Sequence, residues 1–188
     1  MASKQLHGKT VAILAADGFE ESELTHPLKA LTDAGAQVHV ISLKAGSIQG
    51  FRHFEKGEQV KVDRVLSEVR ADAYDALLVP GGLFNPDALR TERSALDFVK
   101  AIATAGKPVA AICHGPWVLA DAGLLEGREV TSVASIRKDL ENAGALWADK
   151  AVVTDNGIVT SRTPKDLEQF SAKVIEEIAE GRHARRAA

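Results

Sequence analysis

Short runs of mostly apolar residues recur along this chain, and each ends in a polar or glycine-containing turn. Residues 10–15, 74–79 and 109–112 form three such runs, a pattern typical of strands buried on both faces of a sheet. Between the first two, leucines within residues 24–31 follow the period of a helix that ends at Gly35. Strands and helices are therefore predicted to alternate.

The same patterns predict the remaining elements. Further strands are expected at residues 38–42, 60–62 and 130–133, and in a hairpin of residues 152–154 and 158–160 joined by Asp155-Asn156-Gly157. Further helices are expected at residues 65–69, from Pro86, at 93–104, from Trp117 to Gly123, at 136–143 between Ser135 as cap and Gly144 as stop, and after Pro164. Residues 44–57 predict a surface loop or small hairpin, and residues 181–188 a frayed tail.

Alternation from end to end predicts an α/β fold, a doubly wound and mostly parallel sheet between helices, with the antiparallel hairpin at one edge. The 188 residues are enough to bury a core and fit one domain spanning residues 1–188. No internal repeat or linker interrupts the pattern.

Composition and charge narrow the function classes. The net charge of -3 gives no electrostatic basis for binding nucleic acid or an anionic membrane. The single cysteine cannot form an intrachain disulfide, and no run has the length of a signal-peptide core or a membrane span, so we expect a cytoplasmic protein. No phosphate-binding motif occurs, and the six histidines are scattered, so we expect neither a nucleotide cofactor nor a metal site.

Candidate chemistry follows the ends of three predicted strands. Because ligands bind at the carboxyl ends of parallel strands, the acidic turn at 17–23, Pro80-Gly81-Gly82 and Cys113-His114-Gly115 are expected at one rim. Cys113 lies where a strand turns into a helix, a position that exposes a nucleophile to helix-start N–H groups. A lone cysteine is otherwise most often a buried, inert residue, and the convergence of the three turns is what argues for a site.

Each turn offers a role, although each also has a structural explanation. The N–H groups of Gly81, Gly82 and His114 are candidates for an oxyanion hole, or the glycines simply form a tight turn. Glu23 is the acid expected to point into the cleft, where a raised pKa would keep it protonated and let it lower the cysteine pKa. His114 is the obvious base, but adjacent side chains diverge on such a turn. Asp87 has the chemistry of an orienting acid or is an ordinary helix-start acid.

The chain resembles the PfpI family of the ThiJ/PfpI superfamily. The residues that carry this resemblance are Glu20, Glu23, Pro80-Gly81-Gly82 and residues 111–116. The likeness extends to residues 127–128, 142–144 and 161–167, and histidine directly after the cysteine is similar to the PfpI branch. Members are described as intracellular cysteine peptidases and as deglycases acting on methylglyoxal and glyoxal adducts of proteins and nucleic acids. The resemblance implies a flavodoxin-like fold, similar to class I glutamine amidotransferases.

The resemblance also implies residue roles. Cys113 would be the nucleophile, His114 its neighbouring base, Glu23 the acid that contacts the thiol, and Glu20 a second acid of the same turn. A third acid comes from the adjoining subunit in this family, and the matching position here is Asp87. A homodimer, or a larger homo-oligomer, would be the functional unit.

These expectations favour a stress-related cysteine hydrolase that repairs methylglyoxal and glyoxal adducts. Two alternatives stay open. The first is an intracellular cysteine peptidase, and the second is a non-enzymatic stress protein that senses peroxide through Cys113 or acts as a chaperone.

Overall fold

A seven-stranded sheet forms the centre of the molecule in the computed structural model, which describes residues 5–183. The strands run in the order β11 (Val152–Asp155), β12 (Ile158–Ser161), β8 (Val109–Ile112), β7 (Ala76–Val79), β1 (Thr10–Leu14), β3 (Gln37–Ser42) and β6 (Arg64–Val65). All neighbouring pairs are parallel except β11 and β12, so the predicted α/β class and edge hairpin are confirmed.

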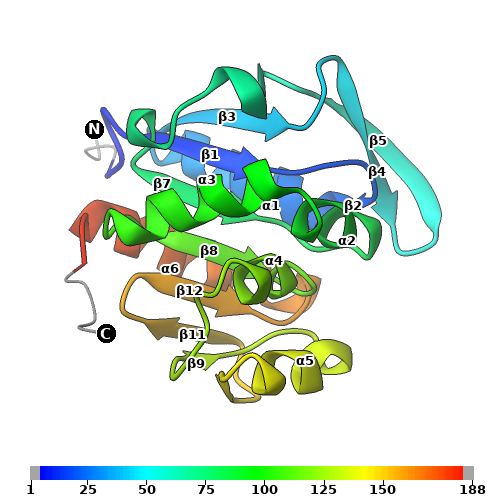
Figure 1. Cartoon of the computed structure of the whole chain (residues 1–188). Coiled ribbons are helices and arrows are strands. Elements are labelled where there is room, and N and C mark those ends of the chain that lie inside the picture. The colour runs from blue at the N-terminus through cyan, green and yellow to red at the C-terminus, as the bar shows by residue number, and fades with distance from the viewer. Residues whose placement is uncertain (1–4, 184–188) are drawn as a thin grey trace.

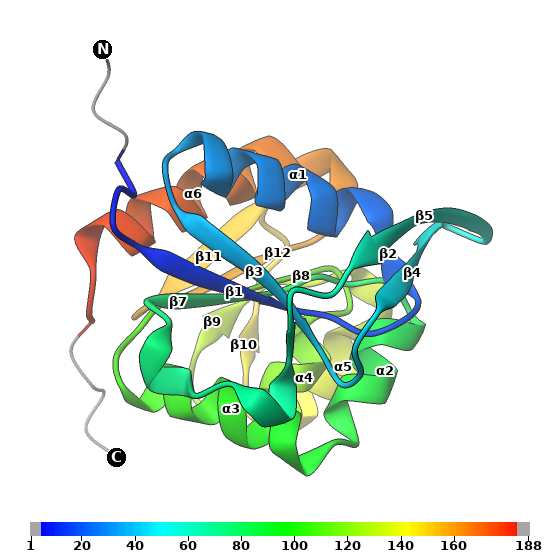
Figure 2. The same cartoon turned by 90° about the horizontal axis from the view of Figure 1, so that it is seen from above.

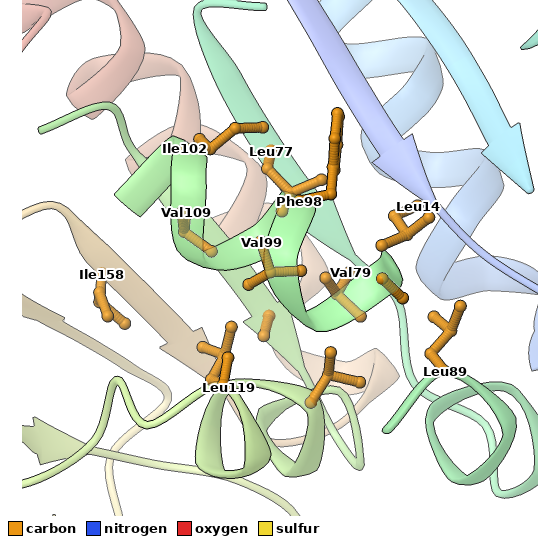
Figure 3. Close-up of a cluster of buried hydrophobic side chains, with 14 of the residues drawn as sticks. Leu14, Leu77, Val79, Leu89, Phe98, Val99, Ile102, Val109, Leu119 and Ile158 are labelled. Atoms are coloured by element: carbon orange, nitrogen blue, oxygen red, sulfur yellow. The ribbon is translucent and has the colours of Figure 1, made fainter. Parts of the chain in front are cut away.

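Helices cover both faces of this sheet, as Figures 1 and 2 show. One face carries α1 (Glu21–Asp33) and α6 (Leu167–Glu180), and the other carries α2 (Phe84–Arg90), α3 (Arg93–Thr104), α4 (Pro116–Asp121) and α5 (Arg137–Asn142). Each face has its own cluster of buried apolar side chains. Figure 3 shows the cluster beneath α3, where Val99 lies among Val79, Val109 and Leu119. The near-continuous apolar sequence of the strands is explained by this double burial.

Two small sheets and four short 3-10 turns complete the fold. β2 (Phe19–Glu20), β4 (Ser47–Arg52) and β5 (Glu55–Lys61) form one small sheet, and β9 (Glu129–Val130) and β10 (Leu146–Trp147) form the other. The turns are η1 (Leu66–Glu68), η2 (Ala71–Ala73), η3 (Ala134–Ile136) and η4 (Pro164–Asp166). Residues 44–57 thus belong to a hairpin, and the brief strand expected at 60–62 is the end of the longer β5.

Several local expectations are corrected. Residues 65–69 do not form an α-helix: Val65 ends strand β6, and Leu66–Glu68 form the 3-10 turn η1. Ser135 does not cap a helix; it lies inside η3, and α5 begins at Arg137 without a side-chain cap. The strand at 130–133 is reduced to the short β9. Of the predicted tail, residues 184–188 lie outside the described residues. Among those described, no helix is long and apolar enough to cross a membrane.

Asn85 fixes the turn after β7 against the turn after β1. Its side chain is fully buried, and its Oδ1 accepts the N–H of Ala16 at 2.7 Å. Its Nδ2 donates to the carbonyls of Pro80 at 2.8 Å and Gly81 at 3.1 Å. One amide therefore satisfies three buried backbone groups and sets the distance between two of the strand ends that carry candidate chemistry.

Candidate active site

Cys113 stands on a sharp turn between β8 and α4, as the sequence predicts. Its φ of 62° is left-handed, a conformation that costs a non-glycine residue roughly 1–3 kcal/mol. Three backbone hydrogen bonds hold the turn: Cys113 N–H to the Ser161 carbonyl at 3.0 Å, Val133 N–H to the Cys113 carbonyl at 3.1 Å, and Gly115 N–H to the Ile112 carbonyl at 2.8 Å. The surrounding strands thus enforce a strained backbone that lifts the sulfur out of the sheet.

Glycine is required at Gly115 in the turn of Cys113 and at Gly81 in the neighbouring turn, because other atoms occupy the space of a side chain. A Cβ on Gly81 would lie 2.7 Å from the Cβ of Cys113 and would overlap the Glu23 carboxylate. A Cβ on Gly115 would lie 2.7 Å from the Val79 carbonyl. Pro80-Gly81-Gly82 is therefore more than a tight turn, since the bare backbone lets Glu23 and Cys113 approach each other.

Glu23 is the buried acid of the site, as expected. It lies in the first turn of α1 with no exposed surface, and its Oε2 accepts the N–H of Gly81 at 2.9 Å. Burial, and secondly the charge of Glu20, raise the pKa of Glu23 to about 8. The carboxyl is therefore mostly protonated at neutral pH, which confirms the predicted direction of its pKa.

The other two acids of this turn both bind the β4–β5 hairpin. Glu21 accepts from the side chain of Arg52 at 3.0 Å and from the N–H of Glu58 at 2.6 Å, and so holds the β4–β5 hairpin. Glu20 lines the same cavity as Cys113, and its Oε2 accepts the N–H of His53 at 3.1 Å.

The expectation that the cysteine pKa is lowered is wrong for this chain. Burial raises the pKa of the Cys113 thiol, and a negative charge on Glu23 raises it further. Both groups are buried side by side, so a negative charge on one disfavours a negative charge on the other. A thiolate can therefore form only while Glu23 keeps its proton.

His114 contacts the sulfur directly, contrary to the expected divergence of adjacent side chains. Its Nδ1 lies 3.4 Å from the Cys113 sulfur, and its Nε2 lies 3.4 Å from the hydroxyl of Ser135. The left-handed backbone at Cys113 explains this contact because it turns the sulfur back toward its neighbour. Burial lowers the pKa of His114, so the imidazole is neutral at pH 7 and can accept a proton.

Two of the three predicted oxyanion donors meet at the sulfur. The backbone N–H groups of Gly82 and His114 both act to lower the pKa of Cys113, and the N–H of Gly82 acts on the Glu23 carboxyl as well. Gly81 does not serve in this way, because its N–H is already donated to Glu23. The sequence predicts three N–H donors at one rim, but it does not predict which of them donates to Glu23.

The sulfur opens into a cavity of about 570 Å³ at the mouth of the three turns. Its lining includes two acids, two apolar side chains and one exposed lysine: Glu20, Glu23, Phe54, Leu83 and Lys165. Phe54 and Lys165 were missed in the sequence, because they come from a hairpin tip and a turn whose approach to β8 no local pattern predicts.

Asp87 is not brought to Cys113 within one chain. It is exposed in the first turn of α2 and does not line the cavity that contains the sulfur. The role that the resemblance gives it therefore depends on a second copy of the chain.

Comparisons of the sequence and of the structure with known proteins agree with one another. The sequence pattern of the DJ-1/PfpI family matches residues 9–177. The Bacillus subtilis protein named "Putative cysteine protease YraA" is 50% identical over 89% of this chain and 96% of its own length. "Deglycase TK1284" of Thermococcus kodakarensis is 46% identical over 84% and 92%. The crystal structure of Drosophila melanogaster DJ-1beta superposes with a TM-score of 0.84 at 32% identity, covering 91% of this chain and 90% of that one.

The raised pKa of Glu23 predicts a pH-dependent stability. The folded carboxyl, with a pKa of about 8, binds a proton more tightly than the unfolded one at 4.5, so unfolding becomes easier as pH rises between these values. From about pH 5.5 to about pH 8, Glu23 should remove about 3 kcal/mol from the free energy of unfolding. Glu23→Gln keeps the shape and removes this loss. Urea denaturation of both proteins at the two pH values checks it, and parallel pH profiles would contradict it.

Proposed function

This chain belongs to the DJ-1/PfpI family, and on that premise we propose that it is a hydrolase in which the sulfur of Cys113 is the nucleophile. The observation that carries the proposal is the set of groups around this sulfur: a protonated acid, a neutral imidazole and two backbone N–H donors. Each has the protonation state that nucleophilic attack on a carbonyl needs.

The substrates favoured by this arrangement are adducts of α-oxoaldehydes such as methylglyoxal with amines and thiols. An α-oxoaldehyde unit presents two adjacent oxygens, and the site presents two N–H donors and a carboxyl proton within one small space. Lactate is the product that water and a methylglyoxal adduct give once the amine or thiol is released.

The first step transfers the thiol proton to Nδ1 of His114 while the sulfur bonds to the carbon that carries the adduct. The amine leaves with that proton, and the resulting hemithioacetal oxygen accepts the N–H groups of Gly82 and His114. Because His114 is neutral before the attack, it can take this proton without first losing another.

The second step moves hydrogen between the two oxygen-bearing carbons and converts the hemithioacetal into a thioester. Glu23 suits this role, since a group with a pKa of about 8 both gives and recovers a proton near neutral pH. Water then hydrolyses the thioester, which frees the sulfur and releases the 2-hydroxy acid. The sum is adduct plus water giving amine plus 2-hydroxy acid.

A peptidase is the second candidate, because a relative of 50% identity carries a cysteine protease name and the cavity is open on one side within a single chain. It would use the same sulfur and the same oxyanion donors on an amide carbonyl. The two candidates differ in what the Cys113 sulfur attacks and in the product released.

We predict that the purified protein releases lactate from methylglyoxal-treated amines and thiols. Cys113→Ser should reduce the rate at least a hundredfold, roughly the loss expected when a covalent nucleophile is removed. Glu23→Gln should lower kcat while Glu92→Gln, an exposed acid at the start of α3, serves as the matched control. Enzymatic lactate detection gives the readout.

Equal lactate release by Cys113→Ser would contradict the adduct-repair proposal. Cys113-dependent cleavage of unfolded casein without lactate release would identify the peptidase instead. Peroxide-dependent formation of a Cys113 sulfenic acid with neither activity would point to the sensing role.

The same proposal includes a homodimer in which Asp87 of one chain approaches Cys113 of the other. Asp87 is exposed on α2, and the surface beside the cavity carries apolar side chains that a monomer leaves in water. Phe54 is 97% exposed, and Leu83 and Phe84 are more than half exposed. Such a cluster is typical of a surface that a partner covers.

Complementation tests this interface. Asp87→Ala and Cys113→Ser should each be nearly inactive, but a refolded equal mixture should recover about a quarter of the wild-type activity per chain, because half of the dimers are mixed and each has one intact site. Lactate release after mixing measures it. No recovery, with mixed dimers demonstrated by mass, would exclude a role of Asp87 across the interface.

A further inference from the structure

A second group of ligand-type side chains lies at the opposite end of the sheet from Cys113. Cys113 follows the carboxyl end of β8, whereas this group lies beside Gly106 and Gly157, which precede the starts of β8 and β12. It consists of Glu177 and Glu180 on α6 and His183 just beyond that helix. The proposed hydrolase uses none of the three.

Regular spacing and one turn bring these residues together. Glu177 and Glu180 are three residues apart and share one helix face. Gly181 ends α6 with a φ of 94°, which folds the chain back and places His183 against the same face. One ligand atom from each side chain lies within 4.8 Å of the others.

His183 is held in place by the sheet rather than by the helix alone. Its N–H donates to the Gly106 carbonyl at 2.8 Å. A Cβ on Gly157 would lie 2.9 Å from its ring, so the imidazole packs directly on the turn before β12. The ring nitrogen Nε2 is thereby fixed toward Glu177.

The closest pair of ligand atoms lies near the spacing of two donors on one metal ion. Oε2 of Glu177 and Nε2 of His183 are 3.1 Å apart, and both are shielded from solvent. Within the described residues neither atom makes a hydrogen bond of acceptable geometry, although Glu177 is only 4% exposed. In a tetrahedral zinc site, bonds of about 2.0–2.2 Å put neighbouring donors about 3.3–3.6 Å apart, so this pair has to open by only a few tenths of an ångström.

The remaining contacts leave these donors available. Lys173 binds the other carboxylate oxygen of Glu177, Oε1, at 3.0 Å and so orients the carboxylate without using Oε2. Glu180 is exposed and can swing its carboxylate toward the pair at little cost. Two carboxylates and one imidazole suit a divalent first-row transition ion, with water completing the shell.

We propose that Glu177, Glu180 and His183 form a binding site for a divalent transition-metal ion, represented by Zn²⁺. The bound ion ties the end of α6 to the turns that precede β8 and β12. It differs from the expectation, drawn from the scattered histidines, that the chain has no metal site. The site is independent of Cys113 and of the proposed hydrolase activity.

Isothermal titration with ZnCl₂ after chelator treatment tests the site. The full chain with Cys113→Ser is used, so that the thiol contributes no binding. We expect one Zn²⁺ per chain, and at a concentration about a hundredfold above Kd a rise in Tm of roughly 5–10 °C. In the same background, Glu180→Gln and His183→Gln should each weaken binding at least tenfold, whereas the matched control Glu176→Gln should not.

Glu180 is exposed, so its variant is expected to keep the fold, which circular dichroism checks. An absence of stoichiometric zinc binding would overturn the proposal and leave Glu177 and His183 as a plain ion pair. Zinc binding that neither Glu180→Gln nor His183→Gln weakens would also overturn it, because the ion would then lie elsewhere.

Discussion

The candidate active site depends on one electrostatic constraint: the buried space shared by Glu23 and Cys113 disfavours negative charge. Glu23 and the thiol face each other there, and burial raises the pKa of both groups. At neutral pH the proton therefore stays on the carboxyl, which makes Glu23 a donor. Burial lowers the pKa of His114, so its imidazole is neutral at the same pH and can accept a proton. One environment thus sets a protonated acid and a neutral imidazole beside the thiol that we propose as the nucleophile.

The fold makes this arrangement possible because three strand ends meet at one rim and glycines leave room between them. Gly81 lets Glu23 reach Cys113, Gly115 lets the turn pack on β7, and Asn85 links the turn after β7 to the end of β1. The left-handed backbone at Cys113 is held by hydrogen bonds to β12 and to Val133. Rigid neighbours therefore maintain the strain and fix the position of the sulfur.

Sequence patterns predict most of this fold because a strand that is buried on both faces of a sheet appears in the sequence as a continuous apolar run. The apolar runs of β1, β7 and β8 are confirmed, as is the Asn156-Gly157 hairpin, whose turn needs two left-handed residues. The short elements around residues 65–69 and 130–136 were predicted less well, since tertiary contacts rather than local period determine them.

The site was predictable as a set of turns but not as a set of contacts. Strand ends brought Glu23, Gly82 and Cys113 to one rim by topology alone. The contact between His114 and the sulfur depends on a single backbone angle, and the use of the Gly81 N–H depends on where Glu23 points. The Glu177, Glu180 and His183 group escaped a motif search because its third member lies beyond the helix and is positioned by Gly181.

The most direct test of the central claim is a carboxyl-carbon NMR titration of Glu23, assigned by difference from Glu23→Gln. The account predicts a resonance of a protonated carboxyl at neutral pH with a midpoint near pH 8. A midpoint close to the ordinary value of 4.5 would contradict it, because Glu23 would then face Cys113 as an anion and could not donate a proton.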